Sequence, residues 1–469
     1  MDHSGSRGLV LTTTSIAAFI TPFLSSAIAF AVPRIGVSFH LDFIEVALIP
    51  MVFLIPLASF MIFFGRISDN VGRVKIFRIG LAIFGISTIA ASFSTSYTFL
   101  IAMVFLAGLG SAVLSTNSTA IVSYVYSSGG RGFALGINAM SVYLGLTFAP
   151  FLGGILIEFI GWRSVFLLSG PVGFAALALS TASLRNIEIH GTTARSGLLG
   201  AGFLAGTILS LTAYVALGDL TGFIRSAYIL PVAAVFIILF IRYGSHGHEE
   251  AIPSEILKGN RTFAASNLTA LLNYLSTFSI VFIFSIYLQV ILHVSPFISG
   301  ILILPEPVFM VALSPVAGKL SDRFGSRAIA SAGMVVIGVS FLGFYLIIPL
   351  YTAIIVLLLG TVGIGFGLFS APNTNSVMGT VSRDNSGTAS GFLGTMRFTG
   401  QLFSIVLATM IISAFIPRSL TVGMFSGTVV TITPQYFSSF SEGFRTVMII
   451  SAILSLIGAF TSLLKNKGD

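Results

Sequence analysis

The sequence predicts an all-α integral membrane protein, and three observations support this fold class. Of the 469 residues, 55% are hydrophobic and only 8% are charged, whereas soluble proteins carry about 25% charged residues. A series of apolar segments runs along the chain, each long enough to cross a bilayer as a helix. One polar loop motif occurs twice, once in each half of the chain, which indicates an internal duplication.

A membrane-spanning helix needs about 20 mainly apolar residues. Fourteen segments meet this requirement, and we expect each to form a transmembrane helix. They cover residues 9–32, 44–64, 76–95, 98–124, 133–159, 164–184, 197–218, 224–243, 263–292, 297–317, 328–348, 350–379, 387–415 and 445–464. The first segment has no clear small-residue cleavage pattern, so we interpret it as a permanent span and not a signal peptide.

The basic residues predict the orientation of the chain. If the N-terminus lies in the cytoplasm, seventeen of the 23 Lys and Arg residues fall in cytoplasmic segments and five in outer loops. An excess of positive charge on the cytoplasmic side is typical of membrane proteins. We therefore expect a multi-pass plasma-membrane protein with both termini in the cytoplasm. The formal charge of +8 then requires no nucleic-acid partner.

The duplicated loop follows the pattern Gly-x-(Ile/Leu)-Ser-Asp-x-x-Gly, followed by basic residues, at 65–75 and 318–327. A glycine at each end permits a tight reversal, and basic residues suit a negatively charged cytoplasmic membrane face. The candidate gating residues are Gly65, Asp69, Gly72, Arg73 and Lys75 in the first copy and Gly318, Asp322, Arg323, Gly325 and Arg327 in the second.

This loop resembles the signature loop of the major facilitator superfamily of transporters. The fifth segment strengthens the resemblance, because it is similar to the antiporter motif of the drug-efflux branches. The matching residues are Gly145, Ala149, Pro150, Gly153 and Gly154, with Ala149 in place of a glycine. Pro150 removes a backbone donor and bends the helix, while the small residues allow a neighbouring helix to approach closely.

Further matches to the fourteen-span drug:proton antiporter branch occur at 161–173, 287–305, 363–367 and 387–401. The resemblance thus extends over nearly the whole chain. It implies a major facilitator fold of fourteen helices, with six-helix bundles at 1–190 and 263–469 and an inserted helix pair with a linker at 191–262.

The chain departs from that branch at two positions. The first helix of the branch carries an acidic residue about nine positions before a proline, but residues 24–33 contain no carboxylate. The fourth helix carries an arginine just before a Gly-x-Gly, where this chain has Val104. Proton coupling through the usual residues of the first half is therefore not expected here.

Two charges are predicted near the middle of the membrane, Glu306 and Arg397. Each costs about 2.5–3.5 kcal/mol on insertion scales, so each requires a reason. One interpretation is that Glu306 binds and releases a coupling proton, with Arg397 modulating it or contacting substrate. Two alternatives stay open: a fixed ion pair that holds two helices together, and a Glu306 side chain that simply faces a wet cavity.

The remaining candidates also have two interpretations each. The duplicated loops act either as a conformational latch between bundles or only as topology signals. Asn273, Tyr274 and Gln401 either contact substrate or only hydrogen-bond helices together, a role worth about 0.6 kcal/mol on average. We also expect Asp69 and Asp322 to cap a following helix or to meet its positive end.

These observations favour a secondary transporter working by alternating access, most simply a proton-coupled exporter of lipophilic or amphipathic drug-like molecules. The alternative is an uncoupled or differently coupled facilitator or importer of a small organic solute. An enzyme would need a cluster of ionisable residues that the sequence does not offer. With zero cysteines and no nucleotide-binding motif, we expect no metal and no cofactor beyond the coupling proton. The expected partners are the lipid bilayer and the substrate, for a protein that functions as a monomer.

Overall fold

A computed structural model describes residues 3–126, 131–185, 187, 197–221, 223–244, 260–347, 351–381, 386–416 and 434–465. All regular elements in these ranges are helical. The first half contains α1 (His3–Phe39), α2 (Phe43–Val71), α3 (Arg73–Ser92), α4 (Tyr97–Val125), α5 (Arg131–Phe159), α6 (Arg163–Ser183), α7 (Leu198–Thr221), α8 (Phe223–Ser226), α9 (Ile229–Leu239) and the π-helical turn η1 (Phe240–Gly244).

The second half contains α11 (Arg261–Thr277), α12 (Ser279–Ile286), the π-helical turn η3 (Tyr287–Ile291), α13 (Pro296–Ile303), α14 (Pro305–Phe324), α15 (Ser326–Leu346), α16 (Thr352–Gly379), α17 (Ser386–Phe415) and α19 (Pro434–Leu463). Two of its spans are each built from shorter pieces: α11, α12 and η3 form one, and α13 and α14 form another.

Twelve helical stretches in the described part of the chain are long and apolar enough to cross a membrane. Within the segments expected at 197–218 and 224–243, the apolar stretches Leu198–Tyr214, part of α7, and Ile229–Tyr243, in α9 and η1, are shorter. The prediction of an all-helical membrane fold is confirmed. The predicted count of fourteen spans and the inserted pair of spans are not confirmed.

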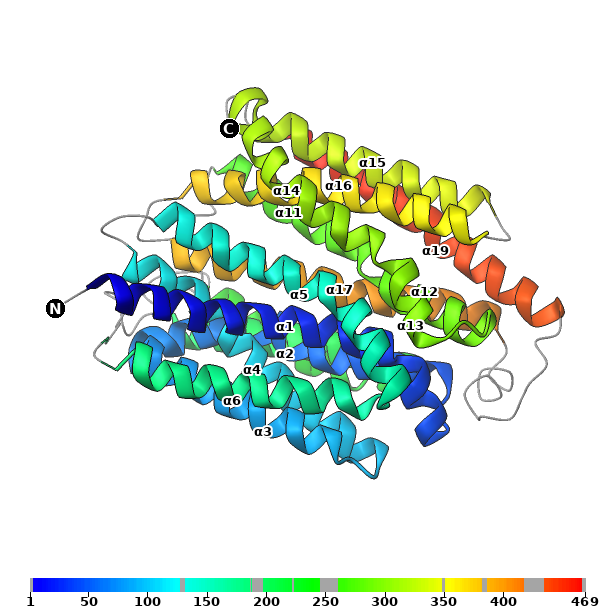
Figure 1. Cartoon of the computed structure of the whole chain (residues 1–469), viewed down its shortest axis with the longest axis horizontal. Helices are drawn as coiled ribbons and strands as arrows, with labels where there is room; N and C mark the ends of the chain where they lie inside the picture. The colour runs from blue at the N-terminus through cyan, green and yellow to red at the C-terminus, as the bar shows by residue number, and fades with distance from the viewer. Residues whose placement is uncertain are drawn as a thin grey trace.

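The twelve spans form two groups that lie side by side. In Figure 1, α1 to α6 occupy the lower part of the view, and α14, α15, α16 and α19 occupy the upper part. Within the first group, α1 packs on α5 and α3 on α4, and within the second, α15 packs on both α16 and α19. The groups meet where α2 packs on α17 and α5 packs on α13 and α14.

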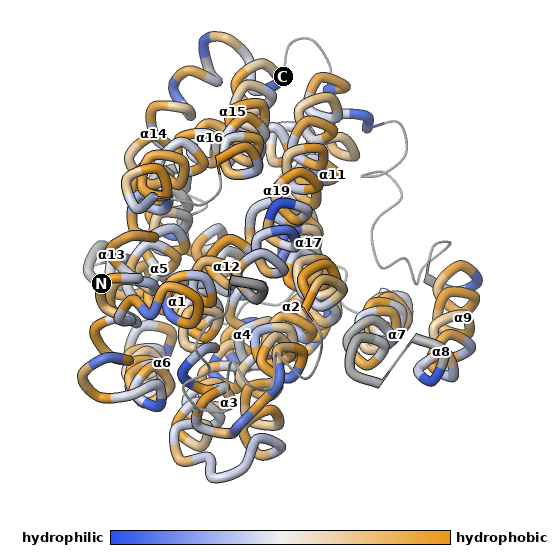
Figure 2. Tube along the Cα trace, turned by 90° about the vertical axis from the view of Figure 1, so that its right-hand side faces the viewer, coloured by the Kyte–Doolittle hydropathy of each residue, from blue (hydrophilic) through white to orange (hydrophobic). Residues whose placement is uncertain are grey.

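Helices α7 and α9 lie to one side of both groups, as Figure 2 shows. Helix α7 packs on α2, and α9 packs on α7. Val232, Val235 and Ile238 on α9 are 48%, 54% and 61% exposed. An exposed apolar helix face of this kind suits contact with lipid.

The duplication seen in the two loops continues into the packing of the helices. Gly72 and Gly325 have φ angles of 110° and 83°, a backbone conformation that favours glycine, at the equivalent turns before α3 and α15. Eight residues later, Gly80 and Gly333 pack against Gly110 and Gly365. In both halves, a Cβ on either glycine of the pair would lie within 3.3 Å of the carbonyl oxygen of the other.

A second repeated contact involves Gly108 on α4 and Gly363 on α16, which lie two positions before Gly110 and Gly365. A Cβ at Gly108 would lie 2.4 Å from the Phe53 carbonyl oxygen, and one at Gly363 would lie 2.0 Å from the Glu306 carbonyl oxygen. Phe53 and Glu306 each lie nineteen residues before the turn glycine of their half. They therefore occupy equivalent places in the two halves of the molecule.

The two ends of the molecule are distinguished by their turns. One end carries Gly72 and Gly325, and we name it the signature end. The other carries His40 and His293, which have positive φ angles of 54° and 51° at equivalent turns after α1 and η3. In each turn the residue two positions later, Asp42 or Ser295, accepts a hydrogen bond as the N-cap of the next helix. We name this end the histidine end.

Candidate functional site

At the histidine end, the two groups of helices are in direct backbone contact. A Cβ at Gly154 on α5 would lie 2.7 Å from the Pro296 carbonyl oxygen on α13, and one at Gly300 on α13 would lie 2.4 Å from the Pro150 carbonyl oxygen. Any side chain at either glycine would force α5 and α13 apart. The antiporter-like segment thus supplies one side of the contact between the two halves.

Other residues of the same segment face α1. A Cβ at Gly145 would lie 2.4 Å from the Phe19 carbonyl oxygen, and Ala149 is fully buried. Gly153 has more room, because its Cβ would lie 3.8 Å from Phe30. The small residues therefore serve both faces of α5, toward α1 and toward α13.

Hydrogen bonds strengthen the contact at the histidine end. The backbone N–H of Phe297 donates to Glu158 Oε2 at 2.8 Å, so a carboxylate on α5 caps the N-terminus of α13. Ser285 Oγ donates to the Ala29 carbonyl at 3.2 Å, and Gln289 Nε2 donates to the Phe30 carbonyl at 3.3 Å. Side chains and backbone groups from both halves therefore join at this end.

At the signature end, the loop residues contact their own half. Arg73 pairs with Asp69 at 2.5 Å within one loop, and Arg78 donates to the Ser180 carbonyl on α6 at 2.8 Å. The Arg323 guanidinium lies 5.3 Å from the ring centre of Phe324. These contacts do not bridge to the opposite group of helices, and the latch interpretation stays a prediction.

The structure tests the expected capping role for one of the two loop aspartates. The N-cap of α3 is Gly72, and no side chain caps that helix, so the prediction for Asp69 as a cap is wrong. Its pairing with Arg73 explains this, because the carboxylate is held within the loop. The Asp322 side chain lies outside the described residues. Lys75 is exposed, as are Lys319 and Arg323 in the second copy.

A polar cluster lies where α5, α11, α16 and α17 meet. The hydroxyls of Tyr143 on α5 and Ser370 on α16 are hydrogen-bonded across the two halves. The Arg397 guanidinium on α17 lies near both Tyr143 and Tyr274, close enough to interact electrostatically with each hydroxyl. We name Tyr143, Tyr274, Ser370 and Arg397 the central cluster.

Arg397 is incompletely paired within this cluster. Its guanidinium carbon lies 4.5 Å from the ring centre of Phe398, and its Nε has no hydrogen-bond partner among the described residues. In the part of the chain that the structure describes, no ion pair joins it to Glu306. The interpretation of these two charges as a fixed structural pair therefore does not describe this structure.

The backbone next to Glu306 contacts α5 one helical turn from Tyr143 of the central cluster. Thr147, four residues after Tyr143, donates to the carbonyl oxygen of Pro307, next to Glu306. One turn of an α-helix is about 5.4 Å long. The carboxylate follows the junction of α13 and α14, and its Oε2 is buried with no partner in the described chain. A buried polar atom of this kind is normally satisfied by a proton, a water molecule or a ligand group.

The other predicted polar residues separate into two environments. Gln401, one turn after Arg397 on α17, is 3% exposed and its Oε1 has no partner in the described chain. Tyr274 packs against Phe366 with ring centres 5.4 Å apart. Asn273 instead donates to Met334 Sδ at 3.2 Å, inside the second group of helices. Tyr274 thus belongs to the central cluster, Gln401 lies one turn from it, and Asn273 points elsewhere.

The two charges lie at positions where the halves differ. The equivalent of Glu306 in the first half is Phe53, because both pack against the glycine of the neighbouring helix. Gly145 on α5 and Gly400 on α17 also make equivalent contacts, to Phe19 on α1 and to Leu271 on α11. Arg397 precedes Gly400 by three residues, and the apolar Val142 precedes Gly145 by three. Both membrane charges therefore belong to the second half alone.

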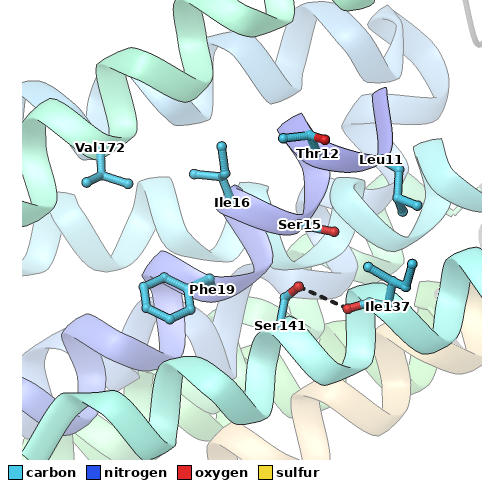
Figure 3. A pocket seen from close by; sticks show the side chains of 8 residues that line it. All are labelled: Leu11, Thr12, Ser15, Ile16, Phe19, Ile137, Ser141 and Val172. Atoms are coloured by element: carbon cyan, nitrogen blue, oxygen red, sulfur yellow. Dashed lines mark hydrogen bonds between the residues drawn. The ribbon is translucent and has the colours of Figure 1, made fainter. Parts of the chain in front are cut away.

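A separate cavity of about 440 Å³ lies among α1, α5 and α6. Figure 3 shows its lining of mostly apolar side chains, with Ser141 donating to the Ile137 carbonyl. Its lining residues are Leu11, Thr12, Ser15, Ile16, Phe19, Ile137, Ser141 and Val172. None of the predicted site residues lines this cavity.

The sequence did not single out Tyr143, Thr147 or Ser370, and for Glu158 it predicts only a solvated position near an outer helix end, whereas the structure shows it capping α13. A signal for Tyr143 and Thr147 was present, since polar residues four apart on a helix share one face and these two precede Pro150 on the antiporter-like segment. Ser370 and Glu158 carry no comparable signal, because their roles depend on partners 227 and 139 residues away in the chain.

Two duplicated groups of membrane-spanning helices, in contact at one end and with isolated charges between them, define a membrane transport protein. A sequence profile described as Major Facilitator Superfamily matches residues 14–405. The chain belongs to that superfamily; it is a transporter and not an enzyme.

Several curated proteins resemble the chain over most of their length. It is 28% identical over 419 residues to the riboflavin transporter RibZ of Clostridioides difficile, covering 88% of this chain and 89% of that protein. It is 24% identical over 415 residues to the multidrug resistance protein Stp of Mycobacterium tuberculosis, covering 88% and 77%. It is also 24% identical over 417 residues to the tetracenomycin C resistance and export protein of Streptomyces glaucescens, covering 87% and 77%.

Solved structures confirm the fold. A bacterial homologue of the human lysosomal transporter Spinster, in an inward-facing and unoccupied conformation, matches with a TM-score of 0.65 and 17% identity over 98% of this chain and 97% of that one. PepTSo2 matches with a TM-score of 0.64 and 15% identity over 96% and 97%. At these identities the likeness concerns the fold alone.

Proposed function

We propose that this transporter works by alternating access and exports drug-like or amphipathic small molecules in exchange for protons. The observation that carries the proposal is the position of Glu306. Its Oε2 is buried without a partner among the described residues, beside a contact between the two halves. A carboxylate in such a place is costly when ionised and unpaired, and uptake of a proton removes that cost.

In this mechanism the two groups of helices move against each other. Residues 1–190 and 263–469 act as the two bundles, and 191–262 as an insert between them. The contacts of Gly154, Glu158 and Gly300 hold the histidine end together in this state. The duplicated loops would engage the opposite bundle in the other state. Because Thr147 joins α5 to the segment at Glu306, separation of the bundles changes the surroundings of the carboxylate.

The orientation and setting follow from the distribution of basic residues. We propose a plasma-membrane location with the signature end and both termini in the cytoplasm, since seventeen bases would then lie inside. The histidine end then faces outward. The protein would function as a monomer, because each chain carries both bundles.

The similarity to exporters supports the direction of transport. Stp is described as a multidrug resistance protein, and the tetracenomycin C protein as a resistance and export protein. Each of these similarities extends over most of this chain.

A second candidate function is an uncoupled or differently coupled facilitator or importer of a small organic solute. Two observations favour it. The relative RibZ is described as a riboflavin transporter, and residues 24–33 and Val104 lack the charges of the usual first-half coupling site.

Proton movement in proteoliposomes separates the two candidates. Purified wild type would be compared with Glu306→Gln under an imposed pH gradient, with lipophilic cations, neutral compounds, riboflavin and aromatic acids as test compounds. Glu442→Gln is the matched control, because Glu442 is an exposed glutamate on α19. Coupled export predicts proton counterflow that Glu306→Gln abolishes and Glu442→Gln preserves. Compound movement with no linked proton flux in any variant would replace the first function by the second.

A further inference from the structure

The charge balance of the central cluster indicates what kind of substrate binds there. Arg397 lies between the two halves, near the hydroxyls of Tyr143 and Tyr274. Within the described residues, no carboxylate pairs with it and its Nε has no acceptor. A guanidinium presents five donors and has no acceptor of its own, so tyrosine hydroxyls satisfy only part of its bonding capacity.

The positive charge of Arg397 is permanent, whereas the negative charge of Glu306 is not. Arginine is not deprotonated in proteins, while a glutamate becomes neutral when it takes up a proton. Because Glu306 forms no ion pair with Arg397 among the described residues, and carries no charge at all once protonated, the positive charge of Arg397 has no fixed counter-charge in the described chain. Burial of such a charge without a partner is costly, and an anion that binds to it removes the cost.

The surroundings of Arg397 also favour a flat, aromatic ligand. Its guanidinium is stacked on Phe398, and Tyr274 makes an edge contact with Phe366, which in turn contacts Phe369. Rings arranged in this way provide apolar area and edges for another ring. Gln401, one turn from Arg397, offers a buried Oε1 with no partner among the described residues, which can accept a hydrogen bond from a ligand donor.

We infer that the substrate is an aromatic compound with an acidic group, and that Arg397 binds this group directly. Tyr274 and Tyr143 flank the acid, and Gln401 accepts a hydrogen bond from a neighbouring donor on the ligand. This inference names the substrate class of the proposed transport site and so rests on the proposed function. A site of this kind disfavours a lipophilic cation, which the positively charged guanidinium would repel.

Binding of two dyes with the same ring system tests the inference. Fluorescein is anionic at pH 7.5, and rhodamine 123 is a cation built on the same xanthene rings. Fluorescence anisotropy would measure their affinities for the full-length protein in lipid nanodiscs. The variants are Arg397→Gln, which removes the charge, and Arg397→Lys, which retains it.

Arg163→Gln is a matched control. Arg163 also stacks on a neighbouring aromatic ring, at 4.4 Å from the centre of Trp162, and donates to the Ser94 carbonyl at the histidine end. Gel filtration and thermal unfolding of each variant establish that it is folded.

The inference predicts that wild type binds fluorescein about tenfold or more tightly than rhodamine 123. Arg397→Gln should lose about tenfold or more of the fluorescein affinity and none of the rhodamine affinity. Arg397→Lys should retain most of the fluorescein affinity, and Arg163→Gln should retain all of it. Tighter binding of rhodamine 123 by wild type, equal binding of fluorescein by Arg397→Gln, or binding of neither dye by folded wild type would overturn the inference.

The binding measurement is independent of coupling. Protein that binds fluorescein through Arg397 but moves no protons would preserve this inference and remove the proton-coupled function. Protein that couples protons to the export of cations would preserve the proton-coupled function and remove this inference.

Discussion

The contact between Gly363 and Glu306 allows the most direct prediction of a packing effect. A Cβ at Gly363 would lie 2.0 Å from the Glu306 carbonyl oxygen and 2.8 Å from its carbonyl carbon. Real Cβ atoms essentially never lie within 3.0 Å of other atoms. Both atoms belong to the backbone and cannot rotate away. Gly363→Ala must therefore push α14 and α16 apart by more than about 1 Å.

The expected cost follows from two opposing terms. Overpacking of a well-packed core costs about 1–3 kcal/mol, while replacing a helical glycine by alanine gains about 0.5–1 kcal/mol. The difference of the two terms predicts that Gly363→Ala lowers the free energy of unfolding by about 1–2 kcal/mol. Because Gly363 contacts the backbone of Glu306, Gly363→Ala should also displace Glu306 and so reduce proton flux per folded molecule.

Gly318→Ala is the matched control. It lies in α14, and its Cβ would meet no atom within 4 Å. Its thermal unfolding temperature in detergent should equal or exceed that of wild type, while that of Gly363→Ala should fall by several degrees. Equal unfolding temperatures for the two variants would refute the close contact between α14 and α16.

Three further predictions concern other parts of the fold. Gly72→Ala, at φ 110°, should destabilise the first loop by about 1–2 kcal/mol, measured by thermal unfolding beside the unstrained Gly318→Ala. Glu158→Ala removes the hydrogen bond that α5 supplies to the N-terminus of α13, in addition to the Ser295 cap, and should increase thiol labelling of a cysteine placed at Phe297. Glu158→Gln, which keeps an acceptor, should increase labelling less, and equal labelling in all three proteins would contradict the role of Glu158. Lys465 is 2% exposed and donates from Nζ to Asn373 Oδ1 at 3.0 Å, and burial lowers its pKa to about 7. Because the unfolded chain retains the proton at higher pH than the folded protein, stability should rise from pH 7 to 9, and Lys465→Met should flatten this rise; an unchanged slope in that variant would exclude Lys465 as its source.

The membrane fold was predictable because the bilayer imposes a simple rule on the sequence. Apolar length alone identifies the twelve spans, and the repeated loop identifies their division into two halves. The same rule also predicts two spans near 197–243 that are not confirmed: α7 is a helix of 24 residues, and the apolar stretches described in this region, Leu198–Tyr214 and Ile229–Tyr243, are shorter. The equivalent glycines were also visible as Gly-x-Gly pairs at 108–110 and 363–365, but only the structure shows that they pack against backbone.

The candidate site was predicted in part. Glu306 and Arg397 stand out because charges are rare inside membranes, and Tyr274 and Gln401 were identified as polar residues within spans. Their relation was not predictable, since whether two charges on α14 and α17 form a pair depends on how the helices of both halves pack. Tyr143 and Ser370 were not identified for the same reason: their hydrogen bond joins two residues from different halves that are 227 positions apart in the chain.

The measurement that tests the central claim most directly is a pair of distances in one protein. The chain has no cysteine, so spin labels can be placed without a background. One pair, at Val71 and Phe324, would report on the signature end, where both residues precede the turn glycines and are 44% and 58% exposed. The other pair, at Ile160 and Leu292, which are 70% and 40% exposed, would report on the histidine end.

Alternating access predicts that proton or substrate binding shifts the two distance distributions in opposite directions, one end closing as the other opens. Replacement of Glu306 by Gln should fix both distributions in the form that wild type adopts at low pH. Distances that stay constant under every condition, or that change in the same direction at both ends, would contradict a transporter built from two halves that move against each other.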